Sequence, residues 1–153
     1  MARFGKVLTA MVTPFGESGD LDLSVAASLA NWLIANGNDG LVIAGTTGES
    51  PTLTHDEQAE LIATVVNAVD APVIAGAGSN DTSAAIELTQ KADQAGASAI
   101  LSVTPYYNRP SQAGLMDHFR AIAGATELPI VPVSYTHLRA HETVLDLVCR
   151  LLL

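Results

Sequence analysis

GLVIAGTTGES, residues 40–50, is the stretch of this sequence that decides its fold. It opens with an apolar, β-branched run that a glycine ends, which is typical of a buried strand entering a turn. The turn carries two adjacent hydroxyls, Thr46 and Thr47, and the carboxylate of Glu49. Hydroxyls and free backbone N–H groups near the start of a helix can hold a small carboxylate. The alternative is a strand-to-helix turn whose hydroxyls only satisfy local backbone groups.

The same alternation of strand and helix patterns recurs along the chain. Apolar runs that predict strands lie at 7–15, 40–44, 72–76, 98–104 and from 128 onward. Helical patterns begin near Ser24, Thr54, Asn80 or Asp81, and Ser111. The residues of the first helix that we expect to face the core are Val25, Leu29, Trp32 and Leu33. Strands that alternate with helices imply βαβ units and a parallel sheet.

Two closures of such a sheet compete, an open doubly wound sheet and a (β/α)8 barrel. No G-x-G-x-x-G pattern follows the first strand, which disfavours a dinucleotide-binding open sheet. Polar residues such as Thr13, Thr46 and Tyr107 gather where strands end, which is the catalytic face of barrels. The sequence therefore predicts an α/β fold, a (β/α)8 TIM barrel truncated after the start of its fifth strand.

Composition limits the partners of the chain. Its 153 residues carry a formal charge of −9 and give a pI near 4.6, which argues against nucleic acid and anionic membranes. No apolar run approaches the roughly 18 residues of a membrane-spanning helix. A single cysteine, Cys149, excludes an internal disulfide. We therefore expect a soluble, cytoplasmic protein.

The motifs GTTGES at 45–50 and TPYYNRPSQ at 104–112 resemble those of the dihydrodipicolinate synthase family. The resemblance runs from about residue 4 to residue 131. It implies a class I, Schiff-base-forming (β/α)8 lyase that needs neither a metal nor an organic cofactor. The paired tyrosines of the second motif point to the synthase rather than to N-acetylneuraminate lyase or keto-deoxy-sugar aldolases, which remain the alternatives.

The activity that this resemblance implies is the condensation of pyruvate with aspartate 4-semialdehyde through a lysine Schiff base. The product is 4-hydroxy-tetrahydrodipicolinate, on the route to diaminopimelate and lysine. The resemblance also implies a homo-oligomer, a tetramer in the complete enzyme. A rival of a different class is a non-catalytic half-barrel that serves as an interaction module.

The resemblance assigns roles to individual residues of the site. Thr46 and Thr47 would bind the carboxylate of pyruvate, Thr47 through both its hydroxyl and its backbone N–H. Thr46 and Tyr107 would form a proton relay, with Tyr107 reaching across an interface into a neighbouring subunit. Hydroxyl chains can move the protons that enamine chemistry requires. Aromatic packing at an interface is the alternative for both tyrosines, and we favour it for Tyr106.

A second family site binds lysine as a feedback inhibitor. The residues here that match positions used by lysine-sensitive members are Ser50, His55, Asn80 and Tyr106. Gln58 and Ala84 stand where those members carry a histidine and a glutamate. A buried ammonium without its carboxylate partner is unfavourable. Lysine inhibition is therefore not expected, and His55 taken alone reads as a surface residue of a capping turn.

The sequence lacks the nucleophile that this chemistry needs, an amine positioned among the strand ends. Lys6 precedes the first strand, and Lys91 lies on the polar side of a helix. The Schiff-base lysine of the family lies on a later strand, and Val133 stands where its fifth-strand tyrosine is expected. We therefore expect no turnover from this chain.

The resemblance breaks after residue 131. We divide the chain into 1–131, the N-terminal half of an aldolase-type barrel, and 132–153, a non-native tail that reads like translated sequencing adapter. The alternative for this tail is an amphipathic helix. Within it, His137 and His141 have the spacing of a metal pair, but no further ligand accompanies them, so no metal site is expected.

Overall fold

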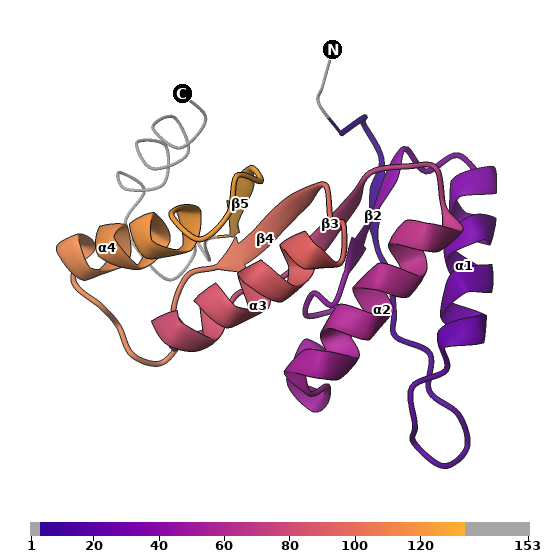
Figure 1. Ribbon diagram of the computed structural model, residues 1–153, viewed down its shortest axis with the longest axis horizontal. Coiled ribbons are helices and arrows are strands. Elements are labelled where there is room, and N and C mark those ends of the chain that lie inside the picture. The colour runs from indigo at the N-terminus through magenta and orange to yellow at the C-terminus, as the bar shows by residue number, and fades with distance from the viewer. Residues whose placement is uncertain (1–3, 134–153) are drawn as a thin grey trace.

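The computed structural model of the chain describes residues 4–133, in which strands alternate with helices as the sequence predicts (Figure 1). The strands are β1 (Leu8–Ala10), β2 (Gly40–Ile43), β3 (Val73–Gly76), β4 (Ala99–Val103) and β5 (Ile130–Val133). The helices are α1 (Leu23–Ala35), the 3-10 helix η1 (Ser50–Thr52), α2 (His55–Ala68), α3 (Thr82–Gln94) and α4 (Gln112–Ala123).

The described strands form one parallel sheet in the order β1-β2-β3-β4-β5. Leu41 pairs with Val73, and Ile100 pairs with Ile130 in the same direction. Crossovers between parallel strands are right-handed, so a sheet that always grows in one direction places every helix on the same face. Figure 1 shows the helices side by side on that face. This is the arrangement of successive units in a barrel, whereas a doubly wound sheet carries helices on both faces.

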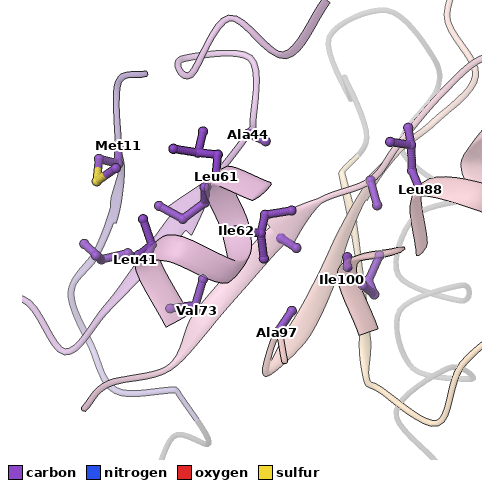
Figure 2. Close-up of a cluster of buried hydrophobic side chains, with 14 of the residues drawn as sticks. Met11, Leu41, Ala44, Leu61, Ile62, Val73, Leu88, Ala97 and Ile100 are labelled. Atoms are coloured by element: carbon purple, nitrogen blue, oxygen red, sulfur yellow. The ribbon is translucent and has the colours of Figure 1, made fainter. Parts of the chain in front are cut away.

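The core lies between the sheet and the helices (Figure 2). Leu41, Val73 and Ile100 point from the strands into this layer and are at most 1% exposed, and Leu61 and Ile62 meet them from α2. Fully burying such a side chain is worth about 1.5–3 kcal/mol. The opposite face of the sheet remains partly open in the described residues, as the intermediate exposure of Val42 and Leu101 shows.

The first strand is shorter than the predicted run from residue 7 to residue 15. The sheet ladder ends when the Met11 N–H donates to the Val42 carbonyl at 3.0 Å. Pro14 has no N–H to extend the ladder, and Val12 is 53% exposed. The chain therefore leaves the sheet early, and Thr13 contacts the turn that follows β2.

The inward face of α1 also differs from the prediction. Val25 and Trp32 are 48% and 60% exposed, whereas Ala26 and Ala30 are fully buried. Leu29 and Leu33 are partly buried and pack against the core as predicted, and α1 lies closely along α2. Periodicity therefore identified the helix and two of its core-facing residues, Leu29 and Leu33, but it was wrong for Val25 and Trp32.

The predicted helix starts are confirmed by their caps. Thr54 and Glu57 form a capping box, in which the Glu57 N–H donates to Thr54 Oγ1 and the Thr54 N–H donates to the Glu57 carboxylate. Asp81, rather than Asn80, caps α3 by accepting from the Ser83 N–H at 2.8 Å. Ser111 caps α4.

The fifth strand pairs with β4 as far as Val133, two residues into the range assigned to the tail. The metal-pair candidates His137 and His141, and the rest of that range, lie outside the described residues. Across residues 4–133 the structure contains no helix that is both long and apolar enough to cross a membrane.

Candidate active site

A cavity of about 360 Å³ opens where the strands end. Thr46, Gly76, Val103 and Val133 line it from the ends of β2, β3, β4 and β5, so the sheet itself brings these positions together. Among the described residues that line the cavity, none is Asp, Glu, Lys or Arg. The cavity therefore presents hydroxyls and backbone groups without a fixed carboxylate, which suits an anionic ligand better than a cationic one.

The turn after β2 folds back on the Gly45 carbonyl. That oxygen accepts from the N–H groups of Gly48 at 3.0 Å and Ser50 at 3.3 Å, and the Glu49 N–H donates to the Thr46 carbonyl at 3.1 Å. In the described structure the N–H and hydroxyl groups of Thr46 and Thr47 donate to no protein acceptor, and both residues are exposed. Four donors on adjacent residues are thus available to a ligand.

Close packing of strand ends shapes this turn. Ala44 adopts a left-handed backbone with φ of 54°, and its carbonyl would lie only 2.2 Å from a Cβ added at Gly76. A side chain at position 76 would therefore collide with the backbone that begins the turn. The end of β3 can pack against the Ala44 backbone only because residue 76 is a glycine.

The two threonines that the sequence groups together differ in their relation to the cavity. Thr46 lines the cavity, whereas Thr47, the next residue, does not. Both remain adjacent at the end of β2, as the sequence predicts for a carboxylate-binding pair.

The two tyrosines of the β4–α4 loop have different surroundings. Tyr106 lines the cavity and is 42% exposed, whereas Tyr107 is 92% exposed and does not line it. Their rings meet edge to face at 5.9 Å. Tyr107 has a positive φ of 66°, so the loop holds its exposed ring in an unusual backbone conformation. Thr46 and Tyr107, the expected relay pair, are not brought together within this chain.

A pair of asparagines braces that loop from the neighbouring strand end. Asn108 Nδ2 donates to the Asn80 carbonyl at 2.8 Å, and Asn80 Nδ2 lies 3.3 Å from the Tyr106 carbonyl and 3.4 Å from Asn108 Oδ1. The sequence indicated Asn80 as a possible helix cap and through the lysine-site resemblance. Its contact with Asn108 depends on the loops of two strands and has no local signal.

Three of the predicted regulatory residues line the same cavity as Thr46, namely Ser50, His55 and Tyr106. Asn80 lies behind them, in contact with the Tyr106 carbonyl. Gln58 is 6% exposed, and its Nε2 donates to the Ser50 carbonyl at 2.8 Å. It therefore serves as a buried brace between α2 and η1, a role that its position in the sequence did not reveal.

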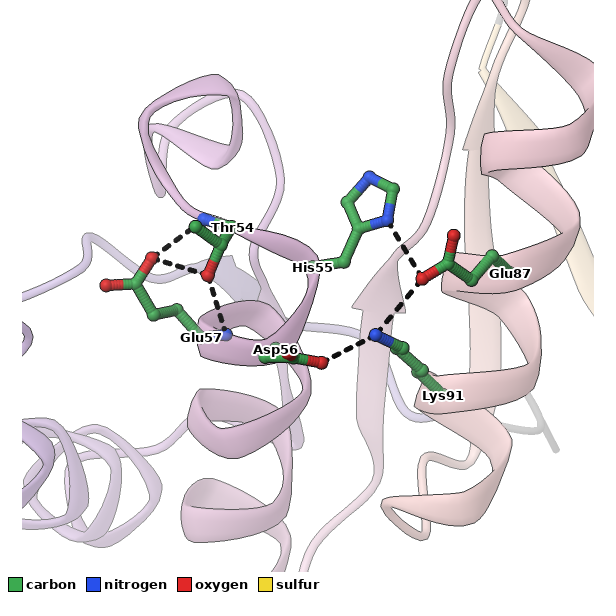
Figure 3. A network of polar contacts seen from close by, with 6 residues as sticks. All are labelled: Thr54, His55, Asp56, Glu57, Glu87 and Lys91. Atoms are coloured by element: carbon green, nitrogen blue, oxygen red, sulfur yellow. Dashed lines mark hydrogen bonds and ion pairs between the residues drawn. The ribbon is translucent and has the colours of Figure 1, made fainter.

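An ion-pair network joins α2 to α3 beside this cavity (Figure 3). Lys91 lies 2.6 Å from the Asp56 carboxylate and 3.1 Å from the Glu87 carboxylate, and His55 Nδ1 lies 3.3 Å from Glu87. Hydrogen bonds to Asp56 and Glu87 raise the pKa of Lys91, and the bond from Lys91 lowers the pKa of Asp56. Lys91 is thus a protonated structural lysine that does not line the cavity.

One further residue of the site was recognised in the sequence only as polar. Thr13 is 6% exposed, and its hydroxyl donates to the Gly48 carbonyl at 2.6 Å. It thereby connects the end of β1 to the turn that carries Thr46 and Thr47. In residues 4–133 no three side chains of His, Cys, Asp or Glu gather in a way that could hold a metal ion.

Parallel βα units with helices on one face and polar groups at the strand ends define a chain of the (β/α)-barrel class. The chain belongs to the dihydrodipicolinate synthetase family, whose model matches residues 3–151. The structure comparisons agree with the predicted barrel: the chain superposes on a dihydrodipicolinate synthase from Bacillus anthracis with a TM-score of 0.90 and 48% identity. That match covers 99% of this chain and 52% of the other.

Two further relatives carry informative names. A 4-hydroxy-tetrahydrodipicolinate synthase from Acidothermus cellulolyticus is 59% identical over 132 residues, which are 85% of this chain and 43% of the relative. A dihydrodipicolinate synthase from Acinetobacter baumannii, solved in complex with pyruvate, matches with a TM-score of 0.83 and 40% identity over 88% of this chain and 47% of that one. The chain thus spans about half the length of the proteins it matches.

Proposed function

We propose that this chain supplies the N-terminal half of a 4-hydroxy-tetrahydrodipicolinate synthase, a cytoplasmic, oligomeric lyase. The complete enzyme would condense pyruvate with aspartate 4-semialdehyde through a lysine Schiff base. The name of the 59% identical Acidothermus relative supports the synthase over the other pyruvate-dependent aldolases. The chain covers 43% of that relative, so its share of the reaction is limited to what its own residues can do.

The share that the geometry supports best is binding of the pyruvate carboxylate by Thr46 and Thr47. The observation that carries this proposal is the set of four donors on these residues, none of which has a protein acceptor in the described structure. They adjoin a cavity whose described lining holds no acidic side chain to repel an anion. Hydrogen bonds to a charged acceptor are worth about 1.5–3 kcal/mol each, enough to hold a small 2-oxo acid weakly.

We assign Tyr107 to the site of a neighbouring subunit, as the outer member of a proton relay with Thr46. Its side chain is 92% exposed and does not line the cavity of its own chain. The backbone at Tyr107 is left-handed, and the hydrogen bond from Asn108 to Asn80 braces the loop that carries this exposed ring. A strained, well-braced residue that projects from a surface is the arrangement expected of a functional contact.

This chain by itself would bind but not turn over its substrate. Lys91 is engaged in ion pairs between α2 and α3, and Lys6 precedes β1. Neither lines the cavity. The imine that would act as electron sink therefore has no lysine in this chain on which to form.

We further propose that lysine does not inhibit the enzyme. Ser50, His55 and Tyr106 line the cavity and Asn80 supports them, but Ala84 supplies no carboxylate and Glu87 is already paired with Lys91. An ammonium group entering this site would lose its hydration without gaining an ionic partner.

We retain the proposal that residues 132–153 are a non-native tail. Sequencing the gene through this region tests it directly. We expect the gene to diverge from the present sequence after residue 131 and to continue into the fifth-strand tyrosine and the lysine strand. A gene that encodes the present tail without interruption would refute the proposal.

Titration of the isotope-labelled chain with pyruvate, followed by two-dimensional NMR, tests the carboxylate site. We expect the amide signals of Thr46 and Thr47 to move in a saturable way. Loss of one hydrogen bond to the carboxylate should weaken binding roughly tenfold in Thr46→Val and Thr47→Val. Thr52→Val is the matched control, because the Thr52 hydroxyl donates to the Glu49 carbonyl and does not line the cavity. Equal affinity in all four proteins would refute the proposal.

A further inference from the structure

We infer that Thr13 is a positioning residue that orients the Thr47 N–H toward the substrate carboxylate. This inference rests on the proposed function, because it names what sets the geometry of the same binding turn. Thr13 does not line the cavity. It acts from the end of β1, on the far side of the turn.

The first step is a buried hydrogen bond between elements distant in sequence. Thr13 Oγ1 donates to the Gly48 carbonyl at 2.6 Å, and both residues are buried. A Cβ added at Gly48 would lie 3.1 Å from the Met11 carbonyl oxygen and 3.2 Å from Thr13 Oγ1. The backbone after β1 thus packs against Gly48 and blocks movement in one direction, while the hydrogen bond opposes movement in the other.

The second step follows from the planarity of the peptide bond. The Gly48 carbonyl and the Glu49 N–H belong to one rigid peptide unit. The Glu49 N–H donates in turn to the Thr46 carbonyl at 3.1 Å. Fixing the Gly48 oxygen therefore fixes the direction of the N–H that holds Thr46.

The third step repeats this relationship one peptide unit further on. The Thr46 carbonyl shares its peptide plane with the Thr47 N–H, which donates to no protein acceptor in the described structure. A continuous chain thus runs from the Thr13 hydroxyl through two peptide units to the donor proposed to bind the carboxylate. Hydrogen bonds in such a chain polarise one another, so Thr13 both orients this N–H and strengthens it as a donor.

Three substitutions of the full chain separate this role from packing. Thr13→Val keeps the shape of the side chain but removes the donor, and Thr13→Ser keeps the donor but removes a methyl group. Thr13→Cys offers a weak donor and serves if the valine variant fails to fold. Thr9→Val is the matched control, because it removes a β1 hydroxyl whose partner, Asn38, lies on the loop before β2.

Two measurements are made on each variant: pyruvate affinity by NMR titration, and hydrogen exchange of the Glu49 amide without ligand. We expect Thr13→Val to weaken pyruvate binding about tenfold, because a misoriented Thr47 N–H would lose its hydrogen bond to the charged carboxylate. Glu49 exchange should accelerate by a similar factor. Thr13→Ser and Thr9→Val should stay within about twofold of the wild type on both measurements.

Unchanged affinity and exchange in Thr13→Val would overturn the inference, and so would a serine variant as weak as the valine variant. If the wild-type chain does not bind pyruvate at Thr46 and Thr47, the proposed function fails. In that case accelerated Glu49 exchange in Thr13→Val alone would still establish that Thr13 positions the turn, and unchanged exchange would refute it.

Discussion

The ammonium of Lys91 lies 2.6 Å from the carboxylate of Asp56 and thereby joins α3 to α2 on the helical side of the sheet. This contact gives Lys91 a structural role in place of a role in Schiff-base chemistry. A Schiff-base nucleophile needs an unprotonated amine among the strand ends, whereas Lys91 has a raised pKa and two carboxylate partners.

The first prediction is that borohydride leaves no pyruvate adduct on this chain. Neither Lys6 nor Lys91 lines the cavity that holds Thr46, so neither can form an imine with the bound 2-oxo acid. Peptide mass mapping after reduction in the presence of pyruvate checks this. A reduced adduct on either lysine at pyruvate concentrations that saturate the binding turn would contradict it.

The second prediction concerns acid stability of the α2–α3 network. Hydrogen bonds from Lys91 lower the pKa values of Asp56 and Glu87 below their ordinary 3.8 and 4.5. A lowered carboxyl pKa in the folded state gives stability that is present above the ordinary value and is lost as the pH falls below it. The difference in urea midpoint between wild type and Lys91→Met should therefore be largest near neutral pH and vanish in acid.

Arg120→Met provides the control for that experiment. Arg120 pairs with Asp117 at 3.2 Å within α4, where both side chains are largely exposed. Exposed pairs within one helix contribute little, so this variant should match the wild type at every pH. If Lys91→Met lowers the urea midpoint by the same amount in acid as at neutral pH, the lysine stabilises through packing of its aliphatic stem instead.

The third prediction concerns His118, which is 5% exposed on α4. Its Nδ1 lies 2.9 Å from the Thr82 hydroxyl, while Nε2 is buried and makes no hydrogen bond in the described structure. Burial lowers the pKa of His118 below its ordinary 6.5, so the unfolded chain takes up a proton before the folded chain does. Stability should then fall as the pH drops below about 6.5, by at most about 1.4 kcal/mol per pH unit.

Urea unfolding of wild type and His118→Gln between neutral pH and about pH 5 measures this slope. Glutamine can keep a contact with Thr82 but does not titrate. The slope attributed to His118 should disappear in the variant. A variant that retains the full slope would assign it to other groups.

The fourth prediction compares two glycines. Gly76→Ala would place a Cβ 2.2 Å from the Ala44 carbonyl oxygen, so we expect a loss of about 1–3 kcal/mol of stability and weaker pyruvate binding. Gly114→Ala lies in α4 with no atom nearer than 3.5 Å and should gain up to about 1 kcal/mol. Thermal unfolding and the pyruvate titration check both. Equal stability of the two variants would show that the strand ends can move apart.

Local patterns predicted much of this fold. The apolar runs at 40–44 and 72–76 contain β2 and β3, and Thr54 with Glu57 marks the start of α2 through a contact between near neighbours. Such signals depend only on residues a few positions apart. Right-handed crossovers are common to barrels and doubly wound sheets, so the barrel was predicted from the polar residues at the strand ends.

What the sequence could not reveal depends on contacts between distant elements. Trp32 is 60% exposed although its spacing fits the core-facing side of α1, whereas Ala26 and Ala30 are fully buried there. Thr13, Gln58 and Asn108 brace the site through partners in other loops, and nothing in their local sequence indicates those partners. The candidate residues Thr46 and Thr47 were found because adjacent hydroxyls at a strand end are themselves a local signal.

A chimera tests the central claim most directly. Residues 4–131 of this chain would replace the matching segment of the Acidothermus cellulolyticus synthase, which is 59% identical over 132 residues and would supply the rest of the barrel. We predict that the folded chimera condenses pyruvate with aspartate 4-semialdehyde, and that Thr47→Val in this chimera raises KM for pyruvate roughly tenfold. A folded chimera without synthase activity, or one whose KM for pyruvate is unchanged by Thr47→Val, would contradict the proposed role of this chain.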